Sequence, residues 1–172
     1  MENSAIEAAL DDAIEAFRGT PESPEEGLTV DDPALVQLRK ACRLLEAAEF
    51  LAAHNGYYTL VIEACFGVIE RTLQFYLFDR DMLHESEFVS HERVYERAEQ
   101  AGLYDAEVRD KLLGLWRNNR AQTYYREGIG SEQSATRMLT LAGQIHDFVV
   151  QLAGQRHECL CPTDKADSSR DN

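Results

Sequence analysis

Hydrophobic residues recur every three or four positions along most of this chain, which is the spacing of amphipathic helices. Capping residues and glycines divide this pattern into segments. The two-residue alternation that predicts β-strands is missing from the sequence, and so is any internal repeat. The sequence therefore predicts an all-α protein. The expected helices run from Ser4 to Gly19, from Asp32 to Gly56, over residues 57–78, from Ser90 to Gly102, from Asp105 to Gly128 and from Ser131 to residue 155.

Three of these segments have a face that we expect to be buried. Segment 57–78 is apolar over more than half of its circumference, so it is expected to be the most buried helix. In the helix that follows Asp105, we expect Val108, Leu112 and Leu115 to face inward. In the last helix, the expected inward stripe consists of Met138, Leu141, Ile145, Phe148, Val149 and Leu152.

The connections between helices predict how the helices are arranged. Most connections are short, so sequential helices are expected to pack as antiparallel neighbours. Residues 33–155 should form an up-and-down bundle of four main helices plus one short helix. Residues 1–32 are expected to form an appended short helix and an acidic linker. Residues 156–172 are polar, and we expect them to form a disordered tail.

The formal net charge of −14 is unevenly distributed over the 172 residues. Residues 1–33 contain ten acidic residues and one basic residue, whereas the expected bundle is close to neutral. Nucleic-acid binding over the whole surface is disfavoured, because phosphate contacts require clustered Lys and Arg. A local cationic patch on the bundle is still compatible with this charge.

Composition also indicates a cellular environment. Only three of the seventeen basic residues are lysines, and this usage together with the acidity is typical of a halophilic, salt-rich cytoplasm. The first residues lack the pattern of a signal peptide, and the sequence has no apolar run long enough to cross a membrane. We therefore expect a cytoplasmic protein without membrane contact.

Four cysteines could serve in packing or in metal binding. Cys42 and Cys65 lie on apolar helical faces and are expected to be small core residues. The Cys-x-Cys spacing of Cys159 and Cys161 is tighter than most zinc sites use, and no second ligand pair lies nearby in the sequence. We therefore expect two free thiols in the tail, with no metal and no cofactor. Further potential zinc donors in the tail are His157, Glu158 and Asp164.

Polar side chains crowd together in one helical segment, residues 116–126 (WRNNRAQTYYR). Buried Arg, Asn and Gln are costly unless they are paired or used. Two explanations are open: a catalytic or binding patch, and a polar network that holds a helix–helix or subunit interface. Helical spacing divides the segment into two neighbouring strips, one with Arg117, Arg120 and Tyr124 and the other with Asn118, Gln122 and Tyr125.

The residue types in this segment suit phosphate binding better than proton transfer. Arginine grips phosphate with two parallel hydrogen bonds, and tyrosine can stack on a base. Metal-free RNA cleavage also needs a group that exchanges protons near neutral pH, for which histidine is best suited. The amide of Gln122 cannot do this. Among the histidines, His54, His84 and His91 are expected at the surface or in loops and His146 near the last apolar stripe, none with a visible catalytic partner.

Over roughly residues 34–155, the chain resembles the HEPN family of small α-helical bundles. In HEPN toxins that are paired with minimal nucleotidyltransferase antitoxins, the motif is Arg-x(4)-His-x-Tyr, often beginning Arg-Asn. Here Arg117, Asn118 and Tyr124 match this motif, and Gln122 stands in place of the histidine. Two other segments look similar to the family: Asn55-Gly56-Tyr57-Tyr58 before an apolar helix that contains Glu70 and Leu73, and Ser90-His91 at the start of a short helix.

The resemblance implies a homodimer with the motif at the dimer interface. It also implies that Arg117 grips phosphate with Asn118 as its polar partner, and that a nucleotidyltransferase partner can modify Tyr124. Arg120 adds a second cation for RNA or nucleotide binding. Because Gln122 stands where the catalytic base belongs, we expect ribonuclease activity to be lost or strongly reduced.

Three functions therefore stay open. The first is a catalytically degenerate HEPN-domain protein that binds RNA, nucleotide or a protein partner in a toxin–antitoxin or defence setting. The second is an active, metal-independent HEPN ribonuclease toxin. The third is a structural or adaptor bundle.

Overall fold

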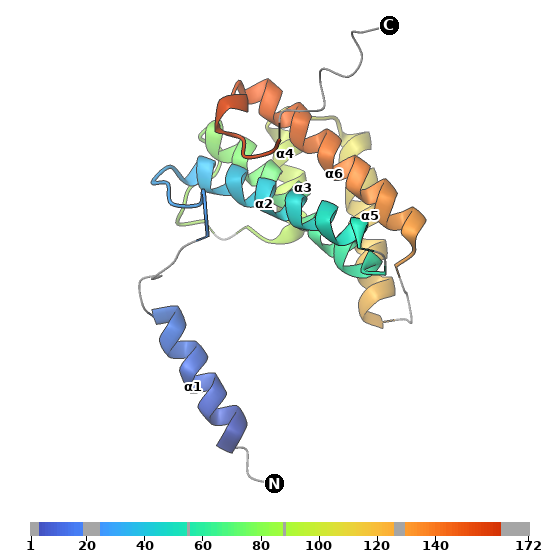
Figure 1. Cartoon of the computed structure of the whole chain (residues 1–172). Coiled ribbons are helices and arrows are strands. Elements are labelled where there is room, and N and C mark those ends of the chain that lie inside the picture. Colours follow the sequence, from blue (N-terminus) through green and yellow to red (C-terminus); the bar gives the residue numbers. More distant parts are fainter. Residues whose placement is uncertain (1–3, 19–24, 55, 88, 126–129, 163–172) are drawn as a thin grey trace, which may run out of the picture.

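The computed structural model describes residues 4–18, 25–54, 56–87, 89–125 and 130–162, without the side chains of residues 4 and 122–125. Within these ranges the chain forms six α-helices, one short 3-10 helix and no strand, which confirms the prediction of an all-α protein (Figure 1). The elements are α1 (Ser4–Arg18), α2 (Pro33–Ala53), α3 (Tyr58–Asp79), α4 (His91–Gln100), α5 (Ala106–Tyr125), α6 (Glu132–Ala153) and the 3-10 helix η1 (Arg156–Glu158).

The helices begin close to the positions that local sequence signals predict. The Asp32 carboxylate accepts hydrogen bonds from the backbone N–H groups of Ala34 and Leu35, which caps α2. The Ser131 hydroxyl accepts a hydrogen bond from the backbone N–H of Ser134 and caps α6. Short polar side chains therefore satisfy backbone N–H groups in the first turns of these two helices.

Helix α3 is the centre of the bundle, as predicted from its apolar circumference. It packs most extensively against α2, then against α6, and less against α4 (Figure 1). Its buried residues point in all directions around the helix, because neighbouring helices cover it on several sides. They are Val61, Ile62, Cys65, Phe66, Val68, Ile69, Glu70, Thr72, Leu73, Phe75, Tyr76 and Leu77.

The buried face of α6 differs from the predicted stripe. Phe148 and Leu152 are 54% and 46% exposed, so their predicted inward position is wrong. The prediction counted large apolar side chains, whereas α6 approaches α3 and α2 through small residues and one buried histidine. This closer approach turns the large residues toward the edge of the bundle. The buried positions of α6 are Ala135, Met138, Ala142, His146, Val149 and Val150.

Helix α5 is also turned relative to the prediction. Leu112 and Leu113 are buried, whereas Val108 and Leu115 are 40% and 39% exposed. The physical reason is that α5 packs mainly on α4, so only a narrow side of the helix is covered. An outward face with apolar residues is left on α5.

The two ends of the chain also differ from each other. Residues 5–18 of α1 are all exposed. Residues 156–162 were expected to be disordered but lie against the bundle, where Glu158 forms an ion pair of 2.6 Å with Arg39 of α2. The Leu160 side chain lies so close to Gly27 that a Cβ at residue 27 would be 2.6 Å from Leu160 Cδ1. Residues 163–172 lie outside the described part of the chain. Within the described part, every helix is too short or too polar to cross a membrane.

Candidate functional site

The polar segment of α5 is tied to α3 through one carboxylate. The Asn119 side-chain amide donates a hydrogen bond of 2.8 Å to Glu63 Oε1, and Arg120 Nη1 lies 3.3 Å from Glu63 Oε2. The Arg120 guanidinium also lies over the ring of Trp116, 5.5 Å from its centroid. Arg120 is therefore half-buried between α5 and α3, with a carboxylate and an aromatic ring as partners.

Arg117 points toward α4 instead. Its Nε donates a hydrogen bond of 2.9 Å to Glu92 Oε1, and its side chain is 57% exposed. This hydrogen bond raises the pKa of Arg117 and lowers the pKa of Glu92. Arg117 and Arg120 were expected to share one cationic strip, but each is paired with a carboxylate on a different neighbouring helix. The expected strip is therefore divided within one chain.

The remaining motif residues are only partly described. Asn118 is exposed. The side chains of Gln122 and Tyr124 lie outside the described part of the structure, so their predicted roles stay predictions. Of the four motif positions, the side chains of Arg117 and Asn118 are thus described, and Gln122 and Tyr124 are placed by the backbone of α5 alone.

His91 has a partner that sequence reasoning missed. Its Nδ1 lies 2.6 Å from Glu70 Oε2, and its ring stacks on Trp116 with 5.9 Å between centroids. Glu70 is buried, and its second oxygen has no hydrogen-bond partner among the described residues. A histidine whose Nδ1–H donates to a carboxylate presents Nε2 as a proton acceptor. The His91 ring itself is mostly exposed, as expected.

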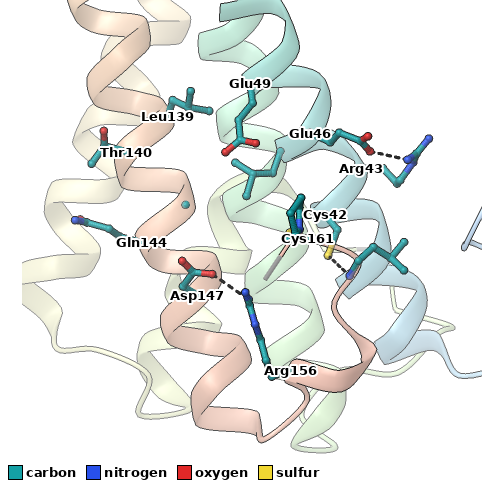
Figure 2. A pocket seen from close by; sticks show the side chains of 14 residues that line it. Cys42, Arg43, Glu46, Glu49, Leu139, Thr140, Gln144, Asp147, Arg156 and Cys161 are labelled. Carbon is teal, nitrogen blue, oxygen red and sulfur yellow. Dashed lines mark hydrogen bonds and ion pairs between the residues drawn. The ribbon is translucent and has the colours of Figure 1, made fainter. Parts of the chain in front are cut away.

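A groove of about 500 Å³ opens between α2, α6 and the C-terminal segment, residues 156–162 (Figure 2). Ion pairs lie along its rim, one of 2.6 Å between Arg43 and Glu46 and one of 3.2 Å between Arg156 and Asp147. Cys42 and Cys161 form part of its wall.

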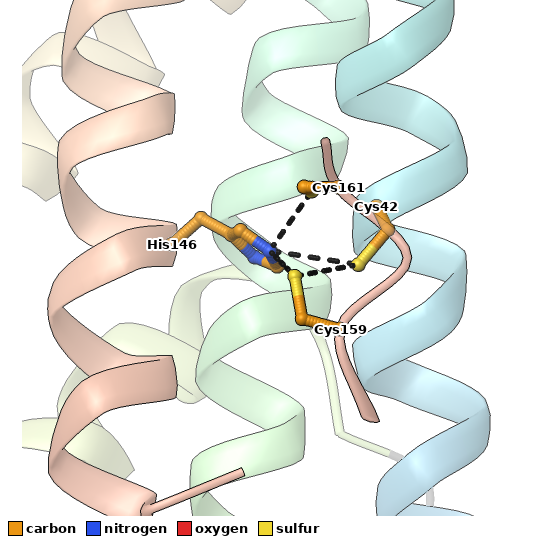
Figure 3. Close-up of side chains that lie close together, drawn as sticks. All are labelled: Cys42, His146, Cys159 and Cys161. Carbon is orange, nitrogen blue, oxygen red and sulfur yellow. Dashed lines mark hydrogen bonds between the residues drawn. The ribbon is translucent and has the colours of Figure 1, made fainter. Parts of the chain in front are cut away.

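Four potential metal ligands converge behind this wall: Cys42, His146, Cys159 and Cys161 (Figure 3). Their ligand atoms all lie within 4.8 Å of one another. His146 Nε2 lies 3.5 Å from Cys42 Sγ, 3.4 Å from Cys159 Sγ and 3.5 Å from Cys161 Sγ. The sulfurs of Cys42 and Cys159 are 3.5 Å apart.

The four residues come from three separate parts of the chain. Cys42 lies on α2, His146 lies on α6, and Cys159 and Cys161 follow η1. No second ligand pair lies near the two C-terminal cysteines in the sequence, but the fold brings one to them. The missing pair lies more than a hundred residues away at Cys42, and on the inner face of α6 at His146. One sequence signal could have pointed to it, because a histidine among the buried positions of an apolar helix needs a polar partner.

Groups of the cluster shift one another's pKa values. Hydrogen bonds from Cys161 and Cys42 lower the pKa of Cys159. Burial lowers the pKa of His146, but its hydrogen bonds to Cys159 and Cys42 oppose this effect, and the pKa is raised to about 9. The thiols and the imidazole therefore interact closely in a site between α2, α6 and residues 159–161.

A family model described as a domain of unknown function, DUF8154, matches residues 1–161. The match covers most of the chain, so the chain belongs to this family. It includes α1 and all four residues of the cysteine–histidine cluster. No curated protein and no solved structure matches the chain significantly. The resemblance to HEPN proteins therefore stays a prediction.

Arg117 and Arg120 should differ in their contribution to stability. Arg120→Ala removes an ion pair and a packed side chain that are both half-buried, at an expected cost on the order of 1–2 kcal/mol in the free energy of unfolding. Arg117→Ala removes an exposed pair and should cost clearly less. Urea denaturation of both variants measures this difference. Equal losses would show that Arg120 is no more embedded in the fold than Arg117.

Proposed function

We propose that this member of the DUF8154 family is a binding module on an HEPN-like bundle, and that it works as a homodimer through the outward face of α5. The observation that carries this proposal is the apolar exposure on that face. Val108 and Leu115 are 40% and 39% exposed, although they belong to a helix inside the compact part of the chain. Apolar side chains on one face of a helix are typical of a surface that another helix covers.

The register of α5 brings these residues together. Val108 and Leu115 are seven positions apart, so they lie on the same face two turns from each other. Asn118 follows one turn later and is also exposed. A mixed apolar and amide face suits a twofold helix–helix contact, in which each residue is presented by both chains.

The electrostatic surroundings of the motif favour a protein partner over RNA. Glu92, Glu96 and Asp110 all lie close enough to Arg117 to raise its pKa. A phosphate would have to displace the Glu92 carboxylate and approach a chain with a formal net charge of −14. Binding of RNA or nucleotide through Arg117, Arg120 and Tyr124 therefore ranks below protein binding. A cytoplasmic toxin–antitoxin or defence setting, with a nucleotidyltransferase as partner, follows from the HEPN resemblance.

One observation favours a second candidate function, that of a metal-independent ribonuclease. The Glu70–His91 pair supplies a proton acceptor that the HEPN-like motif lacks. The ring of Trp116 contacts both His91 and Arg120, so it connects this pair to the polar segment of α5. In this function His91 would be the general base and Arg117 would hold the phosphate. The acidic neighbours of Arg117 weigh against it.

The dimer proposal predicts a specific loss of self-association. Leu115→Glu places a charge in the proposed contact and should convert the dimer into a monomer. Leu152→Glu is the matched control, because Leu152 of α6 is 46% exposed and the variant adds the same charge elsewhere. Size-exclusion chromatography with light scattering measures the mass of each protein. A monomeric parent protein, or a Leu115→Glu variant that still dimerises, would contradict the proposal.

An RNA cleavage assay separates the two functions. As a binding module, the purified protein should not cleave RNA, and Gln122→His should be the variant most able to gain cleavage, because it restores the HEPN motif. As a ribonuclease, the parent protein should cleave RNA without added metal, and both His91→Ala and Arg117→Ala should lower the rate by at least about a hundredfold. Cleavage with this pattern of losses would replace the first function by the second.

A further inference from the structure

The cysteine–histidine cluster has the dimensions of a tetrahedral zinc site. Zn–S bonds of about 2.3 Å and a Zn–N bond of about 2.0 Å place sulfur ~3.5 Å from nitrogen and ~3.8 Å from a second sulfur. The three distances from His146 Nε2 to sulfur are 3.4, 3.5 and 3.5 Å, and the Cys42–Cys159 sulfur distance is 3.5 Å. Four of the six distances between donor atoms are therefore close to those of a tetrahedral zinc site, and the other two are below 4.8 Å.

We propose that Cys42, His146, Cys159 and Cys161 bind one Zn²⁺ ion, and that this ion fastens the C-terminal segment to α2 and α6. Three thiolates and one imidazole form a soft donor set that suits zinc and excludes Ca²⁺ and Mg²⁺, which require oxygen ligands. With four protein ligands the coordination is closed, as in structural rather than catalytic zinc sites. The proposal is independent of the function assigned to α5.

Residues around the cluster hold the ligands in orientation. Nδ1 of His146 lies 3.1 Å from the hydroxyl oxygen of Thr72, a fully buried residue of α3. When Nδ1–H donates to this hydroxyl, the Nε2 lone pair is directed toward the three sulfurs. The backbone N–H of Leu160 donates to Cys42 Sγ at 3.4 Å, and Arg156 Nη1 lies 3.8 Å from Cys159 Sγ. Such contacts stabilise the negative charge that thiolate ligands carry.

Cys65 is a cysteine of the same fold that serves only in core packing, so it can be compared with Cys42. It is fully buried on α3, and burial raises its pKa to about 12. It lies outside the group of four, and no polar neighbour shifts its pKa. Cys42 lies on the adjacent helix and is equally buried, yet it contacts two polar ligand atoms. The contrast separates a core thiol from a ligand thiol and provides a matched control.

A disulfide is the competing use of these thiols. The sulfurs of Cys42 and Cys159 would have to move from 3.5 Å to about 2.05 Å to form one. That bond would use two of the four groups and leave His146 and Cys161 without a role. The groove that reaches Cys42 and Cys161 gives an ion a path to the site (Figure 2).

The ion would organise more than its own ligands. Residues 156–162 also contact α2 through the Arg39–Glu158 ion pair, and Arg39 donates a hydrogen bond of 2.9 Å to the Gly27 carbonyl. Leu160, between the two C-terminal ligands, packs on Gly27. Loss of the ion should therefore loosen the C-terminal segment together with the linker that leads into α2.

Metal analysis of the full chain tests the proposal. The protein, produced with zinc and a reducing agent, should hold one zinc per chain by mass spectrometry of the metal. Cys65→Ala should hold the same amount, whereas Cys159→Ser/Cys161→Ser should hold about a tenth or less. Both serines lie after the last helix, so circular dichroism should show unchanged helix content. A parent protein with iron or no metal, or a double serine variant with full zinc, would overturn the proposal.

A second measurement needs no substitution at a ligand. A chelator should make trypsin cleave the parent protein after Arg156 at least about tenfold faster, because the segment is released. Cys65→Ala should respond equally, and added zinc should reverse the effect. Unchanged cleavage in the chelator, or a Cys42–Cys159 disulfide found by mass spectrometry of the protein kept under reducing agent, would contradict the zinc site.

Discussion

Burial of α3 between α2 and α6 is the constraint on which the rest of this structure depends. Leu38 of α2, Leu73 of α3 and Val149 of α6 are fully removed from solvent at the contacts between these helices. Removing such side chains from water is the main source of stability in a domain of this size. The same packing fixes where α2 and α6 lie relative to each other. Cys42 and His146 are brought together as a consequence, and Thr72 of α3 directs the histidine ring.

Local signals in the sequence predicted the elements of the fold well. The Asp32 and Ser131 caps and the apolar circumference of α3 are properties of short segments, and all three are confirmed. The faces of α5 and α6 were predicted less well, because they depend on which helix lies opposite. Phe148 is large and apolar yet exposed, since α6 packs closely through small residues such as Ala142. Side-chain size and spacing alone do not contain that information.

In the candidate sites, too, local features could be predicted from the sequence, whereas contacts between distant residues could not. The composition of the α5 segment was evident from the sequence, but its pairing with Glu63 and Glu92 depends on how α5 meets α3 and α4. The cysteine–histidine cluster was not predicted, because Cys42 lies more than a hundred residues from Cys159 and Cys161 in the sequence. Once Cys42 and His146 lie beside it, the Cys-x-Cys pair belongs to a group of four potential metal ligands. Contacts of this kind follow from tertiary structure and not from a local motif.

The two regions suggest different tasks within one small bundle. The outward face of α5 has exposed apolar residues, and Arg117 and Arg120 of the same helix are paired with carboxylates. The cysteine–histidine cluster brings four potential ligands from α2, α6 and the C-terminal segment to one point. In this account α5 makes the contacts with a second chain, and the zinc site gives a short, polar C-terminal segment a fixed place on the bundle.

X-ray absorption at the zinc edge of the purified full chain tests the central claim most directly, because it reports the ligand atoms themselves. The account predicts a first shell of three sulfurs at about 2.3 Å and one nitrogen at about 2.0 Å. Cys65→Ala should give the same shell. A shell of oxygen and nitrogen without sulfur would show that any zinc present is bound elsewhere, and would contradict the account.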